Sequence, residues 1–91
     1  MYEAHSESDP RELLELMRAV LPHEELVLQR AEARLLAGVY ALGPRKGQPF
    51  DAHDRTIQEA RTQELRASVV EHRACAARAA LELGPDAEAV P

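Results

Sequence analysis

The chain has 91 residues, a length that allows one domain and excludes two. Its net charge is −5 and its hydrophobic fraction is 45%. Its basic residues alternate with acids instead of clustering, so a nucleic-acid backbone is not expected as a partner. No apolar run is long enough for a membrane span, and the single cysteine, Cys75, excludes an intrachain disulfide and suits a reducing compartment. We therefore expect a cytoplasmic protein without signal peptide or membrane segment.

The N-terminal part of the sequence predicts a disordered tail followed by a helix. Residues 1–8 have no hydrophobic pattern, so a disordered tail is predicted there. A helix is predicted over residues 10–21, because Asp9 is a suitable N-cap and Pro10 suits the first helical position. Pro22 interrupts this pattern, since proline lacks a backbone N–H and disfavours helix in the residue before it. The first arm is therefore either kinked or broken at Pro22.

A second helix is predicted over residues 22–42, starting at Pro22 with acidic residues in its first turn. Leu28, Leu35 and Leu42 recur every seven residues, which places them on one face. Gly43, followed by a proline, is expected to end the helix.

A long third helix is predicted over residues 52–83, after a loop rich in glycine and proline. Asp51 is a suitable N-cap, and the helix contains neither glycine nor proline before Gly84. Its heptad spacing predicts a second apolar seam at Ala67, Val70, Ala74, Ala77 and Leu81. Residues 9–84 thus form a single α-helical domain, and residues 85–91 are expected to be a disordered end.

The lengths of the two arms predict the fold. Each arm has about 32 residues, or about 48 Å at ~1.5 Å per residue, whereas a compact domain of this size has a radius of gyration near ~12 Å. If Pro22 only kinks the first arm, the chain is an all-α helical hairpin, and two hairpins can enclose a core as a dimeric four-helix bundle. If Pro22 turns the chain back, a three-helix-bundle monomer results.

Two side chains invite a metal hypothesis. His72 and Cys75 lie one turn apart on the same helix face, and imidazole and thiolate are both zinc ligands. Structural zinc sites use several cysteines, however, and Cys75 lies among alanines, as a small apolar residue would. We therefore expect no metal and no other cofactor.

Two short patterns are similar to those of known all-α enzymes. Arg66 and His72 have the Arg-x5-His spacing of the HEPN ribonucleases, a match that chance alone supplies in a chain with this many basic residues. The ten residues from Lys46 to Arg55 resemble the stretch that opens the second helix of the small helical chorismate mutases. By that resemblance Arg30 or Arg34, with Lys46 and Arg55, would bind a dicarboxylate. The sequence departs from that family at Thr56, where the family has a glutamate, and it lacks the family's third helix.

The sequence favours a non-enzymatic interaction or regulatory module that self-associates or docks on partner helices. The predicted interface residues are Leu28, Leu35 and Leu42 on the first arm, with Ala67, Val70, Ala74, Ala77 and Leu81 on the second. The enzyme alternative, a helical dimer similar to the chorismate mutases, requires at least two of Arg30, Arg34, Lys46 and Arg55 to point inward without carboxylate partners.

Overall fold

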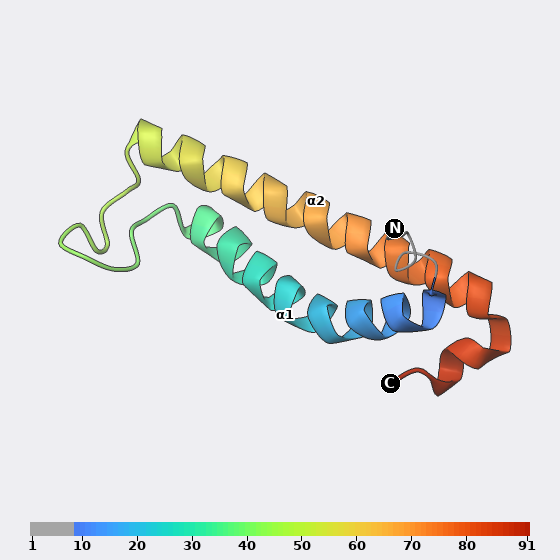
Figure 1. The fold of residues 1–91 in the computed structure, drawn as a ribbon. Helices are drawn as coiled ribbons and strands as arrows, with labels where there is room; N and C mark the ends of the chain where they lie inside the picture. Colours follow the sequence, from blue (N-terminus) through green and yellow to red (C-terminus); the bar gives the residue numbers. More distant parts are fainter. Residues whose placement is uncertain (1–8) are drawn as a thin grey trace, which may run out of the picture.

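The computed structural model describes residues 9–91 and is an all-helical antiparallel hairpin (Figure 1). Helix α1 (Pro10–Ala37) packs against α2 (Ala52–Leu83), and a short 3-10 helix, η2 (Gly84–Ala89), follows. The radius of gyration is 18.0 Å and the extents are 51 × 30 × 18 Å, so the molecule is much more elongated than a globule of this length. Neither α1 nor α2 is both long and apolar enough to cross a lipid bilayer.

α1 is one helix of 28 residues that continues through Pro22. It begins where predicted: the Asp9 carboxylate accepts hydrogen bonds from the backbone N–H groups of Arg11 at 3.0 Å and Glu12 at 3.4 Å. The predicted boundary between residues 21 and 22 is wrong, and so is the three-helix alternative. Proline removes one backbone hydrogen bond, but residues on both sides of it pack against the rest of the hairpin. The arm therefore bends without reversing, as Figure 1 shows between the blue and teal parts of α1.

α1 ends at Ala37, five residues before the predicted end at Leu42. Gly38 has φ 71°, the left-handed conformation typical of a helix C-terminus, and its N–H donates to the Arg34 carbonyl oxygen at 3.0 Å. Residue Val39 then forms an isolated β-bridge with Pro49. The backbone N–H of Tyr40 donates to the Gln48 carbonyl at 2.9 Å. The segment predicted as the last helical turn is thus the first half of a folded loop.

α2 is a single helix of 32 residues with the predicted boundaries. The Asp51 carboxylate accepts from the backbone N–H of Asp54 at 2.7 Å, which satisfies one of the free donors of the first turn. Gly84 ends the helix with φ 60°. The prediction of one uninterrupted rod after the loop is confirmed.

The two helices meet along a heptad pattern that we call the hairpin seam. Its best-buried members are Leu14, Met17 and Ala31 on α1 and Thr62, Val69 and Ala79 on α2. Half-buried residues complete the spacing of three and four on both helices: Leu21, Glu24, Leu28 and Leu35, and Leu65, His72, Ala76 and Leu83. The hydroxyl of the buried Thr62 donates to the Gln58 carbonyl at 2.8 Å, so this polar group is satisfied within α2.

The residues after α2 fold back on the hairpin, which differs from the disordered end predicted for residues 85–91. Ala87 and Val90 are only 8% and 4% exposed, in a cluster with Leu14 and Ala79. Arg18 Nη1 donates to the carbonyl oxygens of Ala87 at 3.2 Å and Val90 at 2.6 Å. The segment is ordered because it covers apolar side chains that two helices alone leave open, and because Arg18 satisfies its carbonyl groups.

Candidate interaction surface

α2 carries small or apolar side chains on two opposite faces, and α1 covers only one. The hairpin seam passes through Leu65, His72 and Ala79, and a second row lies two residues before and two residues after each of them, about 200° around the helix. We call this second row the outward face of α2. It consists of Ala60, Gln63, Ala67, Val70, Ala74, Ala77 and Leu81.

The outward face contains every interface residue that the sequence predicted on the second arm. Ala67, Ala74 and Ala77 are all exposed. The larger side chains Val70 and Leu81 are 59% and 82% exposed. The structure therefore gathers the five predicted residues on one uncovered face of α2, and none of them forms the contact with α1.

The predicted interface residues of the first arm lie elsewhere. Leu28 and Leu35 are half-buried in the hairpin seam, so they contribute to the contact between α1 and α2. Leu42 is 83% exposed in the loop, beyond the end of α1. The three leucines do not form one continuous face, because the helix that would align them ends at Ala37.

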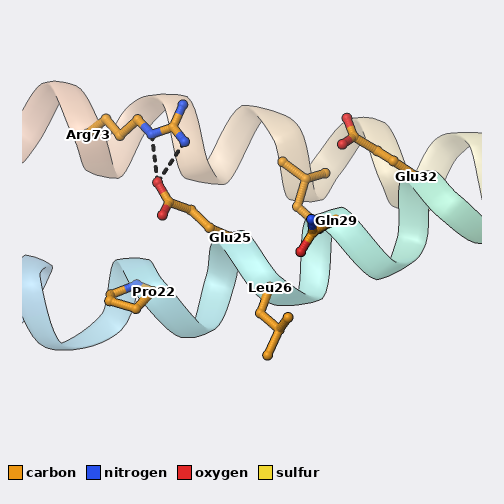
Figure 2. A pocket seen from close by; sticks show the side chains of 7 residues that line it. Pro22, Glu25, Leu26, Gln29, Glu32 and Arg73 are labelled. Carbon is orange, nitrogen blue, oxygen red and sulfur yellow. Dashed lines mark hydrogen bonds and ion pairs between the residues drawn. The ribbon is translucent and has the colours of Figure 1, made fainter.

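An open groove of about 590 Å³ lies between the helices beside Pro22 (Figure 2). Glu25, Glu32 and Arg73 are among its lining residues, and Arg73 bridges the helices by donating from Nε and Nη2 to Glu25 Oε2 at 2.9 and 2.6 Å. In Figure 2 the side chain of Leu26 points away from α2. The residues that line the groove include no serine, threonine, cysteine, lysine or histidine.

Acidic residues of α1 pair with basic residues of α2 across the hairpin and fix its register. Besides the Glu25–Arg73 pair, Arg66 donates to Glu32 Oε2 at 3.3 Å from Nε and 2.9 Å from Nη2. Such exposed pairs contribute about 0–1 kcal/mol each, because solvent screens them. Their spacing matters more: the partners run in opposite directions along the two helices, as an antiparallel register requires.

His72 and Cys75, the two residues of the metal hypothesis, have other surroundings in the structure. His72 Nδ1 lies 2.6 Å from Glu24 Oε1, and Ser68 Oγ donates to Glu24 Oε2 at 3.4 Å. Cys75 is half-buried, and in residues 9–91 no three His, Cys, Asp or Glu side chains gather into a group able to hold a metal ion. The Arg66 and His72 side chains of the Arg-x5-His pattern bind separate glutamates of α1.

The four cations of the enzyme alternative all lie on the surface. Arg30, Arg34, Lys46 and Arg55 are all exposed, so none is buried as the alternative requires. Arg55 lines an open groove that Glu32 also lines, so that groove does not lack carboxylates. Arg55 Nη2 lies beside Gly38, close enough that a Cβ there would be 3.3 Å away. That places Arg55 at the C-terminus of α1, where the helix dipole favours a positive charge.

The loop contains a polar cluster that sequence reasoning missed. The Tyr40 hydroxyl donates to the Asp54 carboxylate, and Arg45 Nη1 donates to Tyr40 Oη at 2.9 Å and to Asp51 Oδ2 at 3.1 Å. The ring of Tyr40 also meets Phe50 edge-on, with centroids 5.1 Å apart. The sequence identifies Asp51 as the N-cap of α2 but does not indicate its bond to Arg45. The cluster could not be foreseen without the early end of α1, which brings Tyr40 into the loop.

Hydrogen bonds in the loop cluster shift the protonation of its members. The backbone N–H of Asp54, and then the Arg45 side chain, lower the pKa of Asp51 because both stabilise its carboxylate. The hydrogen bond to Asp54 is the main cause of the raised pKa of Tyr40, since loss of the proton would break it. These groups are bonded to one another, so the cluster holds the loop in shape.

Comparisons with protein-family models, with characterised proteins and with solved structures find no match for this chain.

Proposed function

We propose that this chain is a non-enzymatic interaction module that self-associates through the outward face of α2. The observation that supports it is the exposure of Val70 and Leu81, at 59% and 82%, in a heptad row opposite the hairpin seam. Heptad rows of this kind are what helices use to pair with one another. The first row of α2 is already covered by α1, so the second is free for another helix.

The energetics favour covering this face. Burying a valine or leucine side chain fully is worth ~1.5–3 kcal/mol, and the alanines between Val70 and Leu81 let a second helix approach closely. A hairpin has too little interior to enclose a large core by itself, and its largest fully buried side chains are Leu14, Val69 and Thr62. Association supplies the missing burial.

The position of the face determines the assembly. Because the outward face lies opposite α1, pairing through it puts the two α2 helices in the middle and the two α1 helices outside. The proposed dimer is then a layer of four helices, which differs from the dimeric four-helix bundle expected from the sequence. The lone, half-buried Cys75 is consistent with work in a reducing compartment such as the cytoplasm.

The test compares two charge insertions at exposed apolar sites. Val70→Asp places a carboxylate in the outward face, whereas Leu36→Asp places one on α1, where Leu36 is 92% exposed. Both variants should keep their helical circular dichroism, because neither site is buried in the hairpin. Sedimentation equilibrium should then show a dimer for the wild type and Leu36→Asp, and a monomer for Val70→Asp. A wild type that stays monomeric, or a Val70→Asp variant that still dimerises, would refute the proposal.

A further inference from the structure

We infer that two copies pair antiparallel along the outward face of α2, with the two-fold axis beside Glu71. The inference rests on the proposed function and adds the orientation, the register and the residues that select a second copy as partner. In this register Leu81 faces Gln63 of the second copy, Ala77 faces Ala67, and Ala74 faces Val70.

The sizes of the side chains favour this orientation. The two largest apolar members, Val70 and Leu81, lie in the middle and at the C-terminal end of the face, and the smaller members fill the rest. An antiparallel pair sets Val70 against an alanine and keeps Leu81 away from its own copy, so the width of the contact stays even. A parallel pair sets Leu81 against Leu81, which holds the helices apart at that layer. It also sets alanine against alanine at other layers, where gaps then remain between the helices.

The charges beside the face favour it as well. Glu64 and Arg78 flank the same side of the outward face, seven residues before and after Glu71, and both are exposed. In the part of the chain that the structure describes, neither has an ion-pair partner. In an antiparallel helix pair each flank meets the same flank of the other helix, so Glu64 of each copy meets Arg78 of the other.

A parallel pair would instead set opposite flanks against each other. Arg73 would then face Arg78, and Glu59 would face Glu64, each twice by symmetry. Only one kind of contact, Arg66 with Glu71, would be attractive, and Arg66 already pairs with Glu32 at 2.9 Å. The antiparallel pair has two attractive contacts between Glu64 and Arg78 and two like-charge contacts, Glu71 with Glu71 and Arg73 with Arg73, and Arg73 already pairs with Glu25 at 2.6 Å. The parallel pair has two attractive contacts and four like-charge contacts, so the charge pattern favours the antiparallel orientation.

A substitution at Glu71 tests the orientation, because it should change the dimer dissociation constant in opposite directions in the two arrangements. At the two-fold axis Glu71 faces Glu71 of the second copy, a like-charge contact that weakens the antiparallel dimer. In a parallel dimer Glu71 would face Arg66 and strengthen it. Glu71→Gln should therefore lower the dimer dissociation constant by about two- to fivefold, the range expected for one exposed charge contact. The control Glu15→Gln makes the same change in net charge on α1 and should leave the constant unchanged.

A charge exchange tests the Glu64–Arg78 contact. Glu64→Arg and Arg78→Glu should each raise the dissociation constant measured by sedimentation equilibrium, because each creates two like-charge contacts. The double variant should return it to within about twofold of the wild type. A double variant as weak as the single ones would overturn the assigned contact.

The orientation can be read directly by pulsed electron paramagnetic resonance. A spin label on Glu59→Cys, in a Cys75→Ser background, would lie about 39 Å along the axis from its copy in the antiparallel dimer, from ~1.5 Å per residue over 26 residues. A parallel dimer would bring the two labels within about 20 Å. A short distance, or weaker dimerisation of Glu71→Gln, would overturn the antiparallel arrangement and leave self-association standing. A monomeric wild type would refute both.

Discussion

Replacing Leu14 by alanine removes a buried side chain at the end of the hairpin opposite the loop. Leu14 is 2% exposed and packs with Ala79, Ala87 and Val90 from two other segments. A buried leucine-to-alanine change costs ~2–5 kcal/mol, and more where neighbours cannot move in to fill the cavity. Two of these neighbours are alanines, whose side chains are too short to fill the cavity. We therefore expect the free energy of unfolding to fall by about 3 kcal/mol. The free energy of unfolding of a domain of this length is only about 5–14 kcal/mol, from ~0.05–0.15 kcal/mol per residue.

The measurement is urea unfolding followed by far-ultraviolet circular dichroism at one protein concentration, with Leu16→Ala as the matched control. Leu16 lies on the same helix but is 54% exposed, so the same change there should cost less than about 1 kcal/mol. Leu14→Ala should also speed proteolysis after Gly84, because Ala87 and Val90 lose their cover. Equal losses of stability in the two variants, or an unchanged rate of cleavage after Gly84, would refute the assignment of Leu14 as the residue that anchors the C-terminal segment.

Three further changes test the caps and the bend. The pKa of Asp51 is lowered in the fold, so its charge stabilises the protein at neutral pH and this contribution is lost as the pH falls through and below ~4. Asp51→Asn, which can still cap α2, should lower the urea midpoint near pH ~7 and match the wild type near pH ~3. Gly38→Ala should cost about 1–2 kcal/mol in urea unfolding, because φ is 71° there. Pro22→Ala should raise the melting temperature, because it restores a hydrogen-bond donor for the Arg18 carbonyl and adds up to ~3 kcal/mol to the free energy of unfolding. A lower melting temperature would mean that the bend is needed for the packing of the hairpin seam.

The boundaries of α2 could be predicted because local chemistry determines them. Asp51 caps its start, Gly84 stops it, and nothing between them breaks a helix. The end of α1 could not be predicted in the same way. Residues 39–42 continue the apolar spacing of the helix, and Gly38 fits that spacing as a small seam residue. What ends the helix is the pairing of Val39 with Pro49, ten residues away across the loop. Local spacing contains no information about that contact.

The same limit explains why the sequence alone could not say which face of α2 packs against α1. Both faces repeat at intervals of three and four residues, so apolar spacing cannot rank them. The choice depends on which face brings complementary charges to α1, and that requires the relative register of the two helices. Once the helices are antiparallel, a step forward from Glu25 to Glu32 matches a step of the same length backward from Arg73 to Arg66.

The charges of α2 therefore divide into two sets that act on different contacts. Arg66 and Arg73 lie beside the hairpin seam and pair with α1, so they select the fold of the single chain. Glu64 and Arg78 have no ion-pair partner within residues 9–91. They lie beside the outward face at equal distances on either side of Glu71, a symmetric spacing of opposite charges. It becomes complementary only when the same helix is turned end to end against itself. In the proposed dimer, the outward face sets where the second copy binds, and Glu64 and Arg78 set the direction in which it runs.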